Sequence, residues 1–79
     1  MEKPKLGIYQ HFKNKKYYRV HGVAKHSETM EDLVLYEPLY EGSPAKFWVR
    51  SIAMFLEEVN WENKKQPRFA YVGEKIPTV

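Results

Sequence analysis

The sequence contains no cysteine and no long run of apolar residues. Without cysteine, a disulfide scaffold, a cysteine-ligated zinc site and a thiol nucleophile are all excluded. Because no apolar stretch approaches the ~20 residues of a membrane-spanning helix, we expect no membrane partner. The beginning of the chain is polar and charged and lacks the apolar segment of a secretory signal, which favours a cytoplasmic protein.

Glycine is also scarce, and the four glycines are too scattered to form a phosphate-binding loop. The conceivable metal ligands are His11, His21 and His26, together with Glu28. His21 and His26 are five residues apart, so on a regular strand they point to opposite faces. No fourth donor for a zinc site can be named. We therefore expect neither a metal ion nor another cofactor.

Aromatic side chains, in contrast, make up 15% of the 79 residues. A domain of about 60 residues buries only about 60% of the surface of its unfolded chain, so a small protein without disulfides needs large side chains in its core. Each aromatic side chain can bury ~150–250 Å², which makes a compact core feasible. We expect one domain over residues 6–72 between flexible segments at 1–5 and 73–79, as a monomer or a homodimer.

The net charge of +3 is distributed unevenly along the chain. Residues 1–26 carry seven positive side chains and one negative, residues 27–62 carry two and eight, and residues 63–79 carry four and one. Plain solvation of surface strands and turns explains this pattern. The alternative is a basic face, formed by the two ends, that meets a nucleic acid or another polyanion. The low net charge then predicts few phosphate contacts and weak binding.

Short alternating patterns separated by turn residues predict strands over residues 6–12, 17–25, 33–40, 47–50, 57–61 and 66–72. One helical turn is expected over residues 51–56, with Ser51 as its N-cap. Gly22 indicates a bulge in the second strand. Simple alternation of the side chains along this strand places Val23 on the face opposite to that of Tyr18 and Val20. Five to seven short strands with at most one helical turn predict an all-β roll or small barrel.

The densest polar cluster is the segment His26, Ser27, Glu28 and Thr29. It offers an imidazole, a hydroxyl and a carboxylate, the parts of a nucleophilic site. Neighbouring residues seldom place a base on the adjacent hydroxyl, however, and no third group is evident to orient the imidazole. A structural turn, in which the hydroxyls bond turn amides, and a ligand-binding loop remain the favoured alternatives.

A second candidate surface combines aromatic rings with arginine. Trp48 and Arg50 lie on the same side of a predicted strand, and Tyr36 and Tyr40 can add to that surface. Aromatic residues with arginine are typical of binding hot spots, and they also suit the stacking of a nucleic-acid base.

The alternative reading of this surface is structural. Trp48 can belong to the core, and Arg50 can pair with Glu57 or Glu58. Arg68, near the end of the chain, can hold a carboxylate across the sheet.

Several motifs follow one another in a characteristic order over residues 6–72: Gly7 to Lys13, Gly22 to Thr29, Val34 to Tyr36, Leu39-Tyr40, Trp48 to Arg50, Met54-Phe55 and Pro67 to Phe69. They resemble a family of small bacterial proteins, the domain of unknown function number 1653. The resemblance implies a small SH3-like barrel or roll. It brings no established activity with it.

The sequence therefore predicts a non-enzymatic binding module with an aromatic and basic groove for a peptide, a nucleotide or a short nucleic acid. The alternative is a homodimer or an accessory subunit that docks on a larger protein, and a small enzyme is the least favoured reading. The candidate binding residues are His26, Ser27, Glu28, Thr29, Tyr36, Tyr40, Trp48, Arg50 and Arg68.

Overall fold

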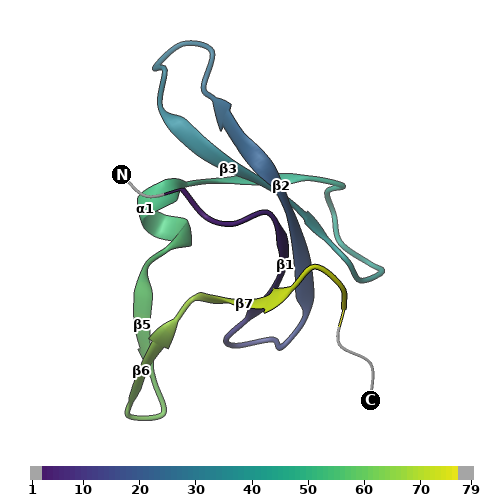
Figure 1. Ribbon diagram of the computed structural model, residues 1–79, viewed down its shortest axis with the longest axis vertical. Coiled ribbons are helices and arrows are strands. Elements are labelled where there is room, and N and C mark those ends of the chain that lie inside the picture. Colours follow the sequence, from purple (N-terminus) through teal and green to yellow (C-terminus); the bar gives the residue numbers. More distant parts are fainter. Residues whose placement is uncertain (1–2, 77–79) are drawn as a thin grey trace.

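The computed structural model describes residues 3–76 and arranges them as short antiparallel strands with one helical turn (Figure 1). The elements are β1 (Gly7–His11), β2 (Tyr17–Lys25), β3 (Asp32–Pro38), β4 (Trp48–Ser51), α1 (Ile52–Phe55), β5 (Glu58–Trp61), β6 (Lys64–Pro67) and β7 (Phe69–Gly73). One sheet has the order β4-β3-β2-β1-β7, and β5 and β6 form a separate hairpin. The prediction of an all-β fold is confirmed.

The large sheet remains open. Its outer strands, β4 and β7, do not pair with each other in the described residues, so the sheet forms no closed barrel. The sheet is nevertheless twisted (Figure 1), and one of its faces is turned inward, because it carries the buried side chains of Tyr18, Val34 and Tyr36. This inward face carries the core and the candidate site.

The bulge predicted at Gly22 is present, because the pairing of β2 with β3 shifts in register between Val20 and Gly22. An extra residue in one strand reverses the side-chain alternation beyond it. Val23 therefore lies opposite the buried Val34 and packs against the core, while Ala24 is exposed. The expectation that Val23 faces away from Val20 was wrong for this reason.

Aromatic rings dominate the core. Phe55 is 1% exposed, and its ring stacks on that of Phe69 with the centroids 4.4 Å apart and the planes 6° from parallel. Tyr9 and Tyr36 meet the same Phe55 ring at centroid distances of 5.2 and 5.5 Å. The remaining core side chains that pack with them are Tyr18, Val20, Val34 and Ile52.

The helical turn α1 begins at the predicted place. The Ser51 hydroxyl accepts a hydrogen bond from the Met54 N–H over 3.2 Å, which satisfies one of the free N–H groups of the first turn. Ile52 and Phe55 are buried, so this turn closes one end of the core. It also redirects the chain from the edge strand β4 into the β5–β6 hairpin (Figure 1).

The end of the chain differs from the prediction. Glu62 and Asn63 both have positive φ, 53° and 63°, which is the geometry of a tight two-residue hairpin turn. Strand β6 therefore starts at Lys64, earlier than expected, and the predicted strand 66–72 is divided into β6 and β7 around Arg68.

Strand β7 pairs with β1, and Gly73, expected in the tail, lies opposite Ile8. The predicted flexibility at residues 1–2 and 77–79 lies outside the described residues. In the part of the chain from 3 to 76, no helix has the length and apolar character needed to cross a membrane.

Candidate functional site

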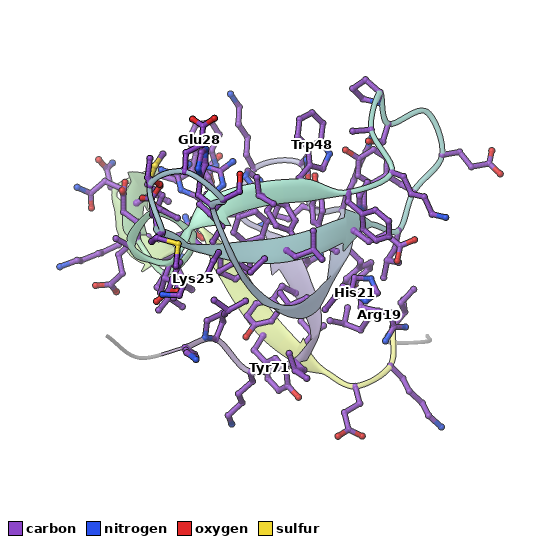
Figure 2. The ribbon with its side chains drawn as sticks, turned by 90° about the horizontal axis from the view of Figure 1, so that it is seen from above. Arg19, His21, Lys25, Glu28, Trp48 and Tyr71 are labelled. Carbon is purple, nitrogen blue, oxygen red and sulfur yellow. The ribbon has the colours of Figure 1, made fainter. Side chains whose placement is uncertain are left out.

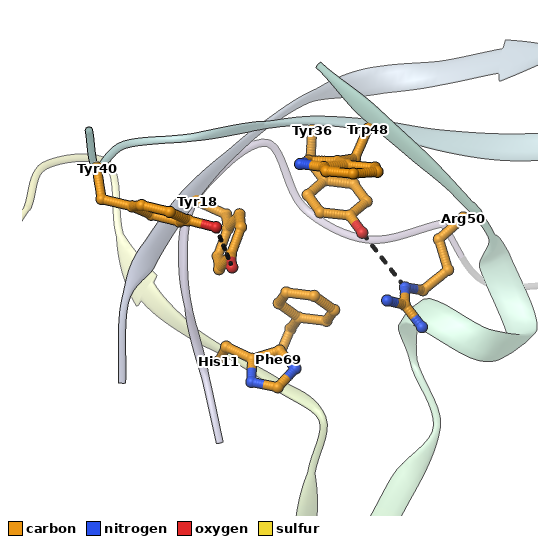
Figure 3. A pocket seen from close by; sticks show the side chains of 7 residues that line it. All are labelled: His11, Tyr18, Tyr36, Tyr40, Trp48, Arg50 and Phe69. Atoms are coloured by element: carbon orange, nitrogen blue, oxygen red, sulfur yellow. Dashed lines mark hydrogen bonds between the residues drawn. The ribbon is translucent and has the colours of Figure 1, made fainter. Parts of the chain in front are cut away.

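A pocket of about 210 Å³ lies on the inward face of the large sheet (Figure 3). Each strand of this sheet contributes at least one side chain to it, and the segment after β3 adds one more. Six of the seven lining residues carry a ring, and the seventh is an arginine; they are His11, Tyr18, Tyr36, Tyr40, Trp48, Arg50 and Phe69. The structure thus brings together four of the predicted binding residues.

Strand pairing explains why Trp48 and Arg50 face the pocket. Trp48 lies opposite Tyr36 and Arg50 lies opposite Val34 in the antiparallel pair of β4 with β3. Directly paired residues share one face of a sheet, and Tyr36 and Val34 belong to the core face. Because β4 is an edge strand, nothing in the sheet lies beyond Trp48, which remains 39% exposed. The alternative that Trp48 belongs to the core was wrong.

Arg50 is held among aromatic rings. Its Nε donates a hydrogen bond to the Tyr36 hydroxyl over 3.3 Å, and its guanidinium carbon lies 5.8 Å from the centroid of the Phe69 ring. Figure 3 shows the guanidinium group beside the Tyr36 ring at the side of the pocket.

The predicted alternative of an ion pair between Arg50 and Glu57 or Glu58 was also wrong. The Glu57 carboxylate is bound by Arg68 at 3.1 Å, and the Glu58 carboxylate lies 3.5 Å from the Lys65 ammonium group. Among residues 3–76, Arg50 has no carboxylate partner. The pocket therefore contains a cation that no carboxylate of the described residues neutralises.

The tyrosine hydroxyls on the other side of the pocket form a short chain (Figure 3). The side-chain amide of Asn14 donates to the Tyr18 hydroxyl over 3.2 Å, and Tyr18 donates to the Tyr40 hydroxyl over 3.3 Å. Burial, together with the hydrogen bond to Tyr40, raises the pKa of Tyr18 to about 12, so this hydroxyl stays protonated. The Lys16 ammonium group lies 4.2 Å from the centroid of the Tyr40 ring.

His11 occupies the floor between these two sides and is a neutral donor. Its Nδ1 accepts a hydrogen bond from the Lys13 backbone N–H over 3.2 Å, so the ring proton resides on Nε2. Burial lowers the pKa of His11, and the positive charges of Arg50, Arg68 and Lys13 lower it further. At neutral pH the imidazole is therefore uncharged.

The segment His26 to Thr29 lies elsewhere, at the tip of the β2–β3 hairpin. Its groups bond one another: His26 Nδ1 accepts hydrogen bonds from the backbone N–H groups of Glu28 and Thr29, at 3.1 and 3.3 Å. The Thr29 hydroxyl accepts one from the Glu31 N–H at 3.3 Å. Glu28 is exposed and lies apart from Trp48 (Figure 2), so the structure does not bring Ser27 and its neighbours to the pocket.

Arg68 also lies outside the pocket lining. It binds Glu57 twice, through its guanidinium group and through its backbone N–H, which donates to the Glu57 carbonyl over 2.9 Å. The conceivable metal ligands are dispersed as well, since His21 pairs with Glu37 at 2.9 Å. Within residues 3–76, no three side chains of the metal-binding types gather at one point.

Three lining residues escaped the sequence analysis of the site: His11, Tyr18 and Phe69. The alternation in β1 places His11 on the face of Tyr9, and the alternation in β2 places Tyr18 on the face of Val20. These patterns were visible, but they identify an inward face only. That the inward face opens into a pocket depends on the pairing of β1 with β7.

The pattern of the family described as "Protein of unknown function (DUF1653)" matches residues 7–71. The chain belongs to this family. A crystal structure of a DUF1653 protein from Bordetella bronchiseptica is similar to it over 95% of each chain, with 35% sequence identity and a TM-score of 0.89. No curated protein matches the sequence. The resemblance drawn from the motifs is confirmed, and the DUF1653 match includes every residue that lines the pocket.

Proposed function

We propose that this DUF1653 chain is a binding module that holds one planar group of its ligand in the aromatic pocket. The observation that carries the proposal is the lining of an open cavity by six rings and by Arg50, which has no carboxylate partner among the described residues. Stacking on such rings contributes ~1–3 kcal/mol for a nucleic-acid base. An aromatic pocket of this kind suits a nucleotide, an unpaired base of a short nucleic acid, or a side chain of a peptide.

The size of the pocket limits the ligand. Its volume of about 210 Å³ lies below the ~300–1,000 Å³ of pockets for drug-sized ligands. One base or one aromatic side chain fits inside, and the rest of a larger ligand lies over the rim. The exposed edge of Trp48 forms part of this rim.

The chemistry of the lining favours binding over catalysis. Among the described residues, no serine, threonine, aspartate, glutamate or lysine lines the pocket. His11 Nδ1 is occupied by the Lys13 N–H, so the imidazole offers no free basic nitrogen to a substrate.

Two tryptophans provide a matched test. Trp48 and Trp61 are equally exposed, at 39% and 38%, but Trp48 lines the pocket and Trp61 lies on the β5–β6 hairpin. Amide NMR spectra of the labelled protein are recorded with mononucleotides, short single-stranded RNA and DNA, and aromatic peptides. We expect shifts at Tyr36, Trp48 and Arg50 for the ligands that bind.

In this titration Trp48→Ala weakens binding by more than ~1 kcal/mol, and Trp61→Ala leaves it unchanged. Both variants retain the dispersed spectrum of the folded protein, because neither indole is in the core. Equal losses for the two variants, or shifts that avoid the pocket, would contradict the proposal.

The edge strand β4 favours a second candidate, a homodimer or an accessory subunit. Val49 and Phe47 are 53% and 44% exposed on or beside this strand, whose outer edge is unpaired in the sheet. Such an edge is open to pairing with another chain. Light scattering over a range of concentrations tests the homodimer, and a constant mass of one chain would remove it. Val49→Lys should abolish any larger species.

A further inference from the structure

The polar groups that face the pocket share one property: each can donate a hydrogen bond to a ligand. Arg50 supplies only N–H donors. One of them, on Nε, is used by the Tyr36 hydroxyl. In the described part of the chain, the terminal nitrogens of Arg50 donate to no protein acceptor, so they are free for a ligand.

The hydroxyls of Tyr36 and Tyr40, each at the end of a hydrogen-bond chain, also have a proton that is free for a ligand. Tyr36 accepts from Arg50, and Tyr40 accepts from Tyr18. Over residues 3–76, neither hydroxyl donates to a protein group, which leaves both protons to an acceptor in the pocket. The Asn14 amide, which donates to Tyr18, fixes the direction of the second chain.

His11 adds a third kind of donor. Because the Lys13 N–H occupies Nδ1, the imidazole presents Nε2–H, and no protein acceptor for it is found in the described residues. The pocket thus displays N–H and O–H groups from three sides, and no acceptor in the described part of the protein receives them.

The charges around the pocket also favour a ligand that is rich in acceptors. No carboxylate of residues 3–76 lines the pocket, whereas Arg50 lines it and the Lys16 ammonium group lies over the ring of Tyr40. A ligand whose polar groups are donors would form no hydrogen bonds with these groups, and a cationic ligand would be repelled by Arg50. A ligand rich in acceptors and negatively charged satisfies both the hydrogen bonds and the charge.

We propose that the planar group in the pocket carries an oxyanion, either a carboxylate or a phosphate, and that this oxyanion binds the free edge of the Arg50 guanidinium group. This inference rests on the proposed function. The hydroxyl protons of Tyr36 and Tyr40 and the Nε2–H of His11 are the neighbouring donors. The planar fork of arginine matches two oxygens of either anion, which lysine does not. The aromatic lining holds the ring, and Arg50 selects the charge.

Benzoate and benzamide are matched probes for this proposal, because they have the same shape and differ in charge and in one donor group. Phenyl phosphate tests the second oxyanion, and inorganic phosphate tests whether the ring is needed. Each probe is titrated into the full-length chain at low salt, and dissociation constants are taken from the amide shifts around the pocket.

We expect benzoate or phenyl phosphate to bind roughly tenfold more tightly than benzamide. Arg50→Gln should remove this preference, so that benzoate and benzamide bind to the variant with similar dissociation constants. Arg50→Lys, which keeps the charge and loses the fork, should restore only part of it. The amide spectrum of each variant shows that it is folded, and if Arg50→Gln fails to fold, Arg50→Lys carries the comparison.

The outcomes separate the two proposals. If benzamide binds in the pocket as tightly as the anions, the oxyanion proposal is overturned while the binding module stands. If neither these probes nor nucleotides, oligonucleotides and peptides shift the pocket residues, both fail. A preference for phenyl phosphate identifies a phosphorylated ligand, a preference for benzoate identifies a carboxylate, and both results support the oxyanion.

Discussion

The Nε–H of Arg50 and the hydroxyl of Tyr36 are joined by a 3.3 Å hydrogen bond between the neighbouring strands β4 and β3. Tyr36 is 5% exposed and belongs to the core, while Arg50 lies at the side of the pocket. The bond therefore ties Arg50, the charged side chain among the described lining residues, to the core. It holds Nε of the guanidinium group at Tyr36, and the proposed ligand would bind the terminal nitrogens.

Tyr36→Phe removes this bond and retains the ring. We expect a loss of about 1 kcal/mol in the free energy of unfolding, the usual net contribution of one hydrogen bond. Binding of benzoate should weaken more than binding of benzamide, since Arg50 loses its orientation and the anion loses a donor. Urea unfolding and the two probe titrations measure these effects. An unchanged benzoate affinity would show that Tyr36 does not position Arg50.

Phe55 is the best-buried ring of the core, at 1% exposure, and stacks on Phe69 of the pocket. Phe55→Ala should cost ~3–5 kcal/mol, because it removes the buried ring and leaves a cavity. Phe47→Ala is the matched control, since Phe47 is 44% exposed, and its effect should remain within about 0.5 kcal/mol. Urea unfolding of both variants makes the comparison, and similar losses would contradict the described core.

Local patterns predicted the features that depend on neighbouring residues. Ser51 precedes a helical turn and caps it, and Trp48 and Arg50 share a face because alternate residues of a strand do so. Gly22 indicated its bulge, but the effect on Val23 was missed. Which residues face inward beyond a bulge depends on the register with the partner strand. The sequence of β2 alone does not contain this information.

The pocket and the polar loop show the limit of such patterns more clearly. His11 and Phe69 come from opposite ends of the chain and meet only because β1 pairs with β7. The segment beginning at His26 has the richest chemistry in the sequence, yet a tight turn with Met30 at φ 64° directs its groups to one another. Residue types identify candidate chemistry, and long-range pairing decides which groups face a ligand.

Gly7 gives a third prediction, on the β1–β7 pairing that completes the pocket. Its φ of +136° is rarely adopted by other residues, and a Cβ there would lie 2.8 Å from the backbone oxygen of Gly73. Gly7→Ala should therefore cost more than ~2 kcal/mol and disturb β7. Gly42→Ala shares only the positive φ, +90°, with no atom within 4 Å of the added Cβ, and should cost about 1 kcal/mol. Urea unfolding distinguishes the clash from the backbone strain.

His11 predicts how stability and binding depend on pH. Burial, and then the charges of Arg50, Arg68 and Lys13, lower its pKa from the ordinary value of 6.5 for histidine, so below that pH the unfolded chain takes up a proton that the folded chain resists. The contribution of His11 to stability is therefore complete above pH 6.5 and is lost as the pH falls from there toward the folded pKa. His11→Gln should flatten this part of the stability profile, and subtracting the two profiles cancels the titration of all other groups.

A bound oxyanion reverses part of this shift, because it offsets the positive charges around the imidazole. Binding of benzoate should then raise the pKa of His11 and become tighter as the pH falls from 7 toward 6. NMR titration of the imidazole Cε1–H, with and without benzoate, measures the shift directly. Benzamide is the control, since a neutral ligand leaves those charges in place. If benzoate and benzamide change the pKa of His11 equally, the change is due to burial of the imidazole by the bound ring. The carboxylate of benzoate then does not reach the cations of the pocket, which contradicts the prediction.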